Sequence, residues 1–374
     1  MLSARDIEIQ QLNYKGLPSS ERMKNQDKQA FMDWIMAYIP TKNRLQGPLQ
    51  VEALAGDAGF RRYFRLNTQP SLIAVDSPPA QENNPAYVSV AMALQAQGIR
   101  TPIIYAVDFT RGFLLLEDFG YDLLQPLLNE NSLGEYYQQA ESTLLALQQT
   151  APKAQIFPVY DALRLHAEMA LFGDWFLGEM LGISLDRNEI SLLDTVFDVL
   201  IESALTQPQV VVHRDYHSRN LMLLPDKSLG VIDFQDAVVG PVTYDLVSLL
   251  KDCYIRWPAE QMRERAIVFK AQSPHCDASG QQQFLRWFDL MGMQRHIKVM
   301  GIFARLALRD GKQSYLKDLP LVIRYSLEAA KAYPETAKFY DWFLQRVEPV
   351  LSAQAWYSDW QMAGEQPFAQ DGVT

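Results

Sequence analysis

The sequence is poor in cysteine and in long apolar runs. Only two of its 374 residues are cysteines, Cys253 and Cys276, and they do not form a paired metal-binding motif. We therefore expect neither a disulfide framework nor a zinc site, and a reducing cytoplasmic setting fits best. No apolar run reaches the roughly 18 residues that span a bilayer, and the N-terminus lacks a basic head before an apolar core. A membrane location is not expected.

Positive charge is also scarce. Lysine and arginine total 34 against 44 acidic residues, which gives a formal net charge of -10. Sequence-independent binding to nucleic acid needs a basic surface, so no nucleic-acid partner is expected and any phosphate must be bound locally. With 48% hydrophobic and 21% charged residues, the chain has an ordinary globular composition that can build two lobes, each with its own core.

Lysine is missing altogether between Asn43 and Thr150. Alternation and composition within and just before this region predict helices over 21–39 and 86–97 and strands over 49–54, 63–66, 72–75, 103–107 and 113–116. The glycine-containing segment 55–62 joins the first two strands. Its backbone amides could bind phosphate, although an ordinary hairpin loop is an equal alternative.

The most informative stretch that is present runs from Val210 to Asp236. Three valines lead into His213, Arg214 and Asp215; Asn220 follows five residues after Asp215, and Asp233 thirteen residues later. Two short apolar runs separated by a Pro-Asp-Lys-Ser turn predict a hairpin between Asn220 and Asp233. One carboxylate to accept a proton and two oxygen ligands for Mg²⁺ are what phosphoryl transfer requires.

Two other interpretations of this stretch remain open. His213 and His217 have the spacing of a zinc-binding helix, but the valine run favours a strand and the glutamate of H-E-x-x-H is missing. Asp215, Asn220 and Asp233 could also each be turn or cap residues.

The same residues carry a family resemblance. The patterns H-x-D-x-H-x-x-N from His213 and I-D-F-x-D from Ile232, with Gly240 to Leu246 downstream, resemble the aminoglycoside phosphotransferase and choline kinase family. The segments 56–65 and 305–320 are similar to bacterial kinases that phosphorylate the anomeric hydroxyl of N-acetylmuramate and N-acetylglucosamine in cell-wall recycling. The missing lysine and the segment 76–79 share this similarity.

The resemblance implies an α+β, protein-kinase-like fold of two lobes, with a small β-rich lobe over 1–118 and a larger, mainly helical lobe over 119–374. It implies ATP and Mg²⁺ as cofactors. Asp215 would act as the catalytic base and His217 would donate to the transferring phosphoryl group. Asn220 and Asp233 would hold Mg²⁺.

The nucleotide site departs from the family. Its strand lysine is replaced within Leu72–Asp76, and the helix expected over 86–97 has no acidic residue. An arginine is the expected substitute because a guanidinium also binds phosphate, and of Arg61, Arg62 and Arg65 we select Arg62. The alternative is that these arginines only lie along the face of a strand. Glu117 and Phe119 would offer main-chain atoms of the interlobe linker to adenine.

The remainder of the chain has helical periodicity. Helices are expected over 133–149, 160–181, 244–255, 257–271, 280–292, 294–309, 318–331 and 335–351. The resemblance also implies that Asp245, at the start of one of these helices, accepts hydrogen bonds from the backbone of the catalytic loop that begins at His213; a plain helix N-cap is the alternative. Asp236 would either support the metal site or face the substrate.

A basic stripe is expected on the helix over 294–309. Arg295, Lys298, Ile302, Arg305 and Arg309 recur every three or four residues. The stripe is either a solvated face or a binding surface for an anionic or heavily hydroxylated acceptor. In the second case, Arg305 could pair with the lactyl carboxylate of N-acetylmuramate.

The expected partner is thus a small amino sugar. Another acceptor such as an aminoglycoside, choline or homoserine, and a nucleotide-binding regulator without catalysis, are the alternatives. The oligomeric state is not predicted.

Overall fold

The computed structural model describes residues 25–54 and 60–365. Residues 21–24 of the first predicted helix and residues 55–59 of the glycine-containing segment lie outside this range. The chain forms two compact units: one comprises Met1–Leu123 and Met222–Gln235, and the other comprises Leu124–Leu221 and Asp236–Thr374. The expected α+β class is confirmed, because strands dominate the first unit and helices the second.

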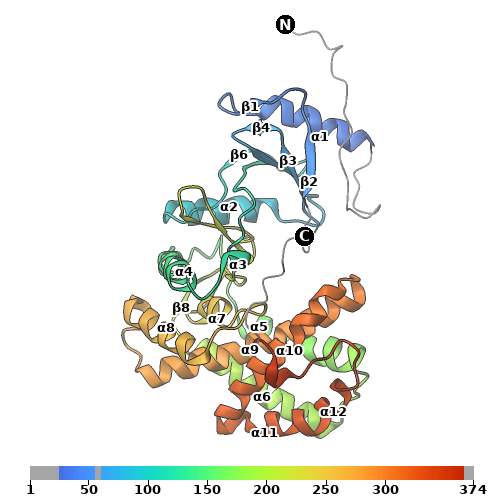
Figure 1. Ribbon diagram of the computed structural model, residues 1–374, viewed down its shortest axis with the longest axis vertical. Helices are drawn as coiled ribbons and strands as arrows, with labels where there is room; N and C mark the ends of the chain where they lie inside the picture. The colour runs from blue at the N-terminus through green and yellow to red at the C-terminus, as the bar shows by residue number, and fades with distance from the viewer. Residues whose placement is uncertain (1–24, 55–59, 366–374) are drawn as a thin grey trace. The chain divides into compact units, whose positions relative to one another are not determined.

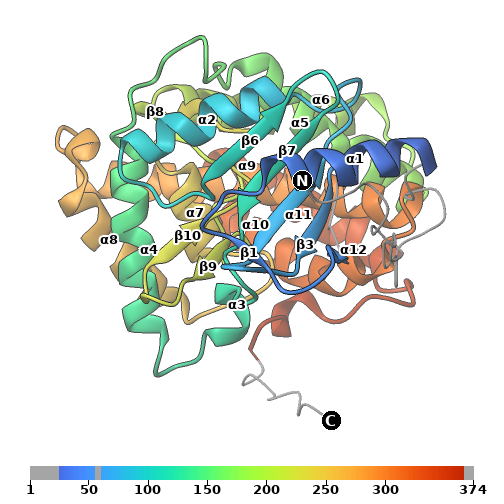
Figure 2. The ribbon, with the colours of Figure 1, turned by 90° about the horizontal axis from the view of Figure 1, so that it is seen from above.

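An antiparallel five-stranded sheet, in the order β2-β3-β5-β7-β6, forms the centre of the first unit. Its strands are β2 (Val51–Leu54), β3 (Arg62–Leu66), β5 (Leu72–Asp76), β6 (Ile104–Asp108) and β7 (Phe113–Glu117), and β1 (Arg44–Leu45) pairs with β4 (Thr68–Gln69). Helix α1 (Asn25–Tyr38) crosses the strands (Figure 2) and buries Phe31, Trp34 and Ile35 against them. The predicted strands are confirmed to within two residues at each end.

The direction of the side chains on β3 decides what each face of the sheet can do. Phe64 and Leu66 belong to the core under α1, as do Leu72 and Ala74 on the neighbouring strand. Because side chains alternate along a strand, Arg62 lies on the same face as Phe64, and Tyr63 and Arg65 lie on the other face. The α1 face is filled by this core, so the opposite face is the one that can receive a ligand.

A hairpin from later in the chain completes the first unit. Strands β9 (Leu221–Leu223) and β10 (Leu229–Val231) pair with each other, as predicted. Leu223 N–H donates to Asp122 O (2.8 Å) and Val231 N–H donates to Arg100 O (2.8 Å). Residues 222–235, which we expected in the second lobe, therefore group with the first unit. The predicted boundary after Asp118 stays a prediction.

Helices make up most of the second unit (Figure 1). They are α3 (Leu124–Leu127), α4 (Leu133–Gln148), α5 (Ala162–Leu171), α6 (Arg187–Leu205), α7 (Tyr244–Leu250), α8 (Ala259–Gln272), α9 (Gln281–Arg309), α10 (Leu319–Ala332), α11 (Pro334–Trp342) and α12 (Glu348–Leu351). Shorter or wider helical turns are η2 (Phe172–Met180), η3 (Pro274–Cys276), η4 (Gln313–Asp318), η5 (Phe343–Val347) and η6 (Trp360–Met362). A single strand pair, β8 (Gln209–Val212) with β11 (Val238–Pro241), carries the loop that begins at His213.

The long helix α9 lies at the centre of this unit, beside α10 (Figure 1). It corrects the expectation of two helices over 280–292 and 294–309, because the chain passes through Gly292 without a break. Another helix, α6, was not predicted. Within the described ranges, no helix is long and apolar enough to cross a membrane.

Candidate active site

The loop from His213 to Asn220 is fixed at its start by Asp245. The Asp245 carboxylate accepts hydrogen bonds from the backbone N–H groups of His213 (2.6 Å) and Arg214 (3.0 Å), which confirms the role predicted for it. Arg214 has a φ of +79°, a left-handed conformation that is strained for a residue with a side chain. Asp245 therefore holds the backbone in a turn that would otherwise relax.

The end of the loop is fixed in a similar way. Asp252 accepts hydrogen bonds from Ser218 N (3.1 Å) and Ser218 Oγ (2.6 Å). The Asn220 side chain donates to Asp215 O (2.9 Å), and Tyr216 OH donates to Ala140 O (2.9 Å). The loop is thus held at both ends and in the middle, which leaves the Asp215 side chain projecting from a rigid support.

Asp215 combines accessibility with an ionised carboxylate. Its side chain is 44% exposed, so an acceptor hydroxyl could reach it. Burial of the surrounding site would raise the pKa of Asp215, but Lys298, Arg295 and nearby side chains hold that pKa well below its usual range. The carboxylate is therefore charged at neutral pH and ready to accept a hydrogen bond.

A network of charged side chains surrounds the base of Asp215, and two of its members, Arg295 and Lys298, are buried. Arg295 Nη1 donates to Arg214 O (3.0 Å) and lies 3.5 Å from Asp215 Oδ1. Lys298 Nζ donates to Tyr244 OH (2.6 Å) and lies 3.5 Å from Glu168 Oε2, and Glu168 also pairs with Arg214. Because Arg295 and Lys298 are buried, losing an acidic partner leaves a buried charge without compensation.

Sequence analysis placed Arg295 and Lys298 on a basic stripe but did not find this network. Their residues are only 2% and 3% exposed, so they do not form a solvated face. The spacing of basic residues along α9 was a correct signal for one helical face. It carried no information about what that face contacts, and Glu168 on α5 gave no signal.

His217 lies two residues after Asp215, and its backbone N–H donates to Asp215 O (3.0 Å). Burial lowers the pKa of His217, so its imidazole is neutral at pH 7. Its Nδ1 is buried and has no hydrogen-bond partner among the described residues. The role predicted for it, donation to the transferring phosphoryl group, stays a prediction.

Asn220 and Asp233 were predicted to hold Mg²⁺. Since the amide nitrogen of Asn220 is used by Asp215 O, its amide oxygen is left for a ligand. Asp233 is exposed, has a φ of +62° and accepts one hydrogen bond from Gln235 (2.8 Å). Carboxylate and amide oxygens suit Mg²⁺. The two residues belong to different units, so their joint assignment rests on the sequence motif.

The zinc alternative requires His213 and His217 to lie on one helix, but both residues lie in the loop after β8. His213 Nδ1 accepts a hydrogen bond from Asp215 N–H (3.2 Å), so one ring nitrogen of this histidine is already used.

The predicted adenine-binding linker follows β7. Glu117 N–H donates to Ile103 O (2.8 Å), and its carboxylate pairs with Arg100. Phe119 is buried with Met222 and Leu224, and its backbone forms no hydrogen bond with another described residue. Phe119 therefore has main-chain groups to offer, whereas the N–H of Glu117 is already occupied.

The three arginines of the first unit have different partners. Arg62 pairs with Asp76 on the face that α1 covers. Arg65 forms a bidentate pair with Asp118 (2.6 and 2.8 Å) and donates to Gly120 O (2.7 Å). Arg61 pairs with Glu82 (3.1 Å). The geometry does not favour Arg62, the arginine that we chose from the sequence.

In the second unit, the stripe residue Arg305 differs from its neighbours. Arg309 pairs with Asp310 (2.7 Å) and is exposed, whereas Arg305 is half-buried and its Nε has no partner among the described residues. Burial and the charge of Arg309 lower the pKa of Arg305. Asp236 is exposed, and its predicted role stays a prediction.

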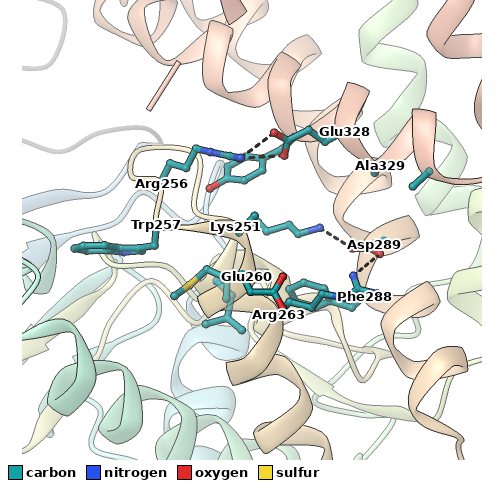
Figure 3. A pocket seen from close by; sticks show the side chains of 14 residues that line it. Lys251, Arg256, Trp257, Glu260, Arg263, Phe288, Asp289, Glu328 and Ala329 are labelled. Atoms are coloured by element: carbon teal, nitrogen blue, oxygen red, sulfur yellow. Dashed lines mark hydrogen bonds and ion pairs between the residues drawn. The ribbon is translucent and has the colours of Figure 1, made fainter. Parts of the chain in front are cut away.

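A separate cavity of about 220 Å³ lies between α7, α8, α9 and α10 (Figure 3). Most of its charged side chains are paired: Lys251 and Arg263 pair with Asp289, and Arg256 pairs with Glu328. The residues that line it include none of the loop from His213 to Asn220. We assign no chemistry to this cavity.

Comparison with known proteins agrees with this site. The model of the phosphotransferase enzyme family matches residues 50–277. The chain is 40% identical over 314 residues to the N-acetylmuramate/N-acetylglucosamine kinase of Pseudomonas aeruginosa. The alignment covers 82% of this chain and 92% of that protein.

Solved structures show the same fold at low identity. A choline kinase from Cryptosporidium parvum covers 85% of this chain and 99% of its own, with a TM-score of 0.58 and 11% identity. An ADP-bound aminoglycoside phosphotransferase covers 82% of this chain and 99% of its own, with a TM-score of 0.53 and 12% identity. The protein-kinase-like fold is thereby confirmed.

Proposed function

Because the chain belongs to the phosphotransferase enzyme family, we propose that it transfers the γ-phosphoryl group of ATP to the anomeric hydroxyl of N-acetylmuramate or N-acetylglucosamine. The observation that carries the proposal is the accessible, ionised carboxylate of Asp215 on a loop fixed by Asp245 and Asp252. The acceptor class is supported by the 40% identity to a kinase named for these sugars.

Asp215 would orient the acceptor hydroxyl by accepting its hydrogen bond. A carboxylate with a depressed pKa is a weak base, which suits a reaction in which the proton leaves late, after charge has spread over the phosphoryl oxygens. Bound Mg²⁺, with Asn220 and Asp233 as its protein ligands, would neutralise charge on the phosphates.

Aromatic side chains beside the loop support a sugar acceptor. The rings of His217 and Tyr254 meet edge to face (5.4 Å between centroids), Tyr254 stacks with Phe303 (6.0 Å), and Phe303 contacts Tyr315 (4.9 Å). Tyr254 and Tyr315 remain partly exposed. Binding sites for small molecules commonly combine such apolar walls with a few polar groups, and a pyranose has both kinds of surface.

Arg305 would recognise the carboxylate that distinguishes N-acetylmuramate. It lies seven residues after Lys298, so it shares a helical face with Lys298 at a distance of about 10 Å along the axis of α9. An unmatched, half-buried guanidinium is suited to pairing with a carboxylate.

The proposal is tested with MgATP and each sugar, with phosphorus NMR as the readout. We expect an anomeric phosphate from both sugars and no product from the methyl glycosides, in which the anomeric hydroxyl is blocked. Asp215→Ala should keep nucleotide affinity and lose turnover by about 10²- to 10⁴-fold. Product from a methyl glycoside, ADP formation only with choline or an aminoglycoside, or nucleotide binding without ADP from any acceptor would contradict it.

The role of Arg305 has a separate test. We expect Arg305→Ala to raise KM for N-acetylmuramate by about 10-fold and to leave KM for N-acetylglucosamine unchanged, because a charge-assisted hydrogen bond contributes about 1.5–3 kcal/mol. Arg309→Ala is the matched control, because Arg309 is exposed and paired with Asp310. Equal effects on both sugars would remove Arg305 from the acceptor site.

A further inference from the structure

None of the strands β2, β3, β5, β6 and β7 contains a lysine. A nucleoside triphosphate nevertheless needs a cation to hold its phosphates. Three arginines on or beside β3 are available. Arg62 lies on the face covered by α1, and Arg65 is held by three hydrogen bonds to Asp118 and Gly120 that use its Nε and Nη2, which leaves only Nη1 without a partner among the described residues. Arg61 remains.

Arg61 is held in place by two side chains. Its Nη2 lies 3.1 Å from Glu82 Oε2, and its guanidinium lies over the ring of Tyr87, 5.3 Å from the centroid. Glu82 also accepts a hydrogen bond from Phe60 N–H (3.0 Å). Tyr87 belongs to α2 (Asn84–Ala96), and Glu82 lies two residues before this helix. The arginine is therefore oriented before any ligand binds.

The Arg61 guanidinium has an N–H donor that no described residue uses. The Arg61 side chain is only 9% exposed, and its Nε is buried with no hydrogen-bond partner among the described residues. A buried donor without a protein partner can donate to a ligand, and because Nη1 of Arg65 shares this feature, the position of Arg61 decides between the two arginines. Since the guanidinium presents five N–H donors in a fork, an anionic oxygen ligand is the natural partner.

The position of Arg61 within the unit also fits a phosphate. The ring of Tyr87 contacts Phe234 (5.0 Å between centroids), the residue that follows Asp233. Desolvation raises the pKa of Tyr63 to about 12, while the charge of Arg61 lowers it and that of Asp233 raises it, so both charges act on one ring. A cation and the proposed metal-binding carboxylate thus lie on the same side of the sheet, away from α1.

We propose that Arg61, held by Glu82 and Tyr87, binds the phosphates of the nucleotide and takes over the role of the missing strand lysine. Glu82 is a positioning residue in this assignment, since it orients the guanidinium and offsets part of its charge. The inference rests on the proposed use of ATP but not on the identity of the acceptor.

Calorimetric titration of the full chain with ATP, ADP and adenosine tests this proposal. We expect Arg61→Ala to weaken binding of MgATP and MgADP by about 10- to 100-fold, the range of a charge-assisted contact, and to leave adenosine affinity within about twofold. Arg61→Lys should recover part of the loss because it keeps the charge. Glu82→Gln should weaken ATP binding by less than Arg61→Ala.

Arg111→Ala is the matched control, because Arg111 pairs with Asp108 in a turn of the same unit and should leave all three affinities unchanged. Equal losses for adenosine and ATP in Arg61→Ala would show a structural role and overturn the proposal. So would wild-type affinity for ATP in that variant, or a phosphate-specific loss in Arg62→Ala alone. If Arg61→Ala does not fold, Arg61→Lys and Glu82→Gln decide the question, and wild-type ATP affinity in both would overturn the proposal. Because no acceptor is present, a wrong acceptor assignment cannot change these results.

Discussion

The positive charges around Asp215 lower its pKa, so its carboxylate stays ionised at neutral pH. Arg295 and Lys298 reach it from α9, and Glu168 offsets their charge from α5. Asp245 differs, because its oxygens accept hydrogen bonds from the backbone N–H groups of His213 and Arg214. The two carboxylates therefore respond to pH in opposite ways.

Asp245 should give the fold a measurable dependence on pH. Burial raises its pKa from 3.8 to about 6, against the charge of His213 and the two backbone hydrogen bonds. A raised pKa in the folded state means that Asp245 favours folding fully below pH 3.8, and that this contribution is lost as pH rises through 6. Relative to Asp245→Asn, the wild type should lose about 2–3 kcal/mol of unfolding free energy between pH 4 and pH 7. Urea titrations of both proteins across that range measure the difference.

Asp289→Asn supplies the opposite control. Lys251 and its other partners lower the pKa of Asp289 despite burial, so its contribution is present above its unfolded pKa and is lost as pH falls. The free energy of unfolding of the wild type, relative to that of Asp289→Asn, should therefore rise with pH. Relative to that of Asp245→Asn, it should fall over the same range. A difference for Asp245→Asn that does not vary with pH would show that Asp245 titrates normally.

Individual residues could be predicted from sequence where the family resemblance assigns them a role. The hydrogen bonds of Asp245 were predicted correctly because the family places an aspartate at the start of the helix that follows the catalytic loop. Arg62 and Arg61 are adjacent in the chain, and choosing between them requires knowledge of which face of β3 α1 covers. No pattern within the strand contains that information, because alternation defines two faces without saying what packs on each.

At the scale of elements, α9 shows how burial can join two predicted helices. We expected separate helices over 280–292 and 294–309, but the described helix continues through Gly292 and Met293 and is 29 residues long. The helix is buried against α5, α6, α7 and α10, so tertiary packing stabilises it beyond its own propensity. The unpredicted α6 did carry a local signal, a capping box formed by Asp186 and Glu189.

The two glycines of α9 should respond oppositely to a methyl group. A Cβ added to Gly301 would lie 2.3 Å from the backbone carbonyl carbon of Leu171, so α9 and α5 would have to separate. Gly301→Ala should therefore cost about 1–3 kcal/mol of unfolding free energy. Gly292→Ala meets nothing closer than Lys251 Cδ at 3.5 Å and should stabilise the helix by about 0.5–1 kcal/mol. The urea midpoints of the two variants should shift in opposite directions, and a shared shift would show that α9 and α5 pack less closely than described.

At the scale of the whole molecule, the chain leaves the first unit at Leu123 and returns to it for residues 222–235. The returning segment supplies Met222 and Leu224 to the cluster around Phe119, and Phe234 to the contact with Tyr87. Sequence analysis predicted the hairpin itself correctly. Its membership of the first unit was not predictable, because the contacts that decide it join residues about 100 positions apart.

Hydrogen exchange can test this membership. Because segments of one cooperative unit open together, the amides of 222–235 should share their opening free energy with β5 and β7 and not with β8 (209–212). Ala74→Gly removes a fully buried methyl group from β5 and should lower protection of 222–235 by roughly 1 kcal/mol while leaving 209–212 unchanged.

Ala304→Gly is the matched substitution in the second unit, at a fully buried position of α9. It should lower protection in α9 and β8 and leave 222–235 unchanged, since the hairpin takes its backbone hydrogen bonds from Arg100 and Asp122. If 222–235 followed Ala304→Gly instead, the hairpin would open with the helical unit. The predicted division after Asp118 would then describe the cooperative units better than the contacts do.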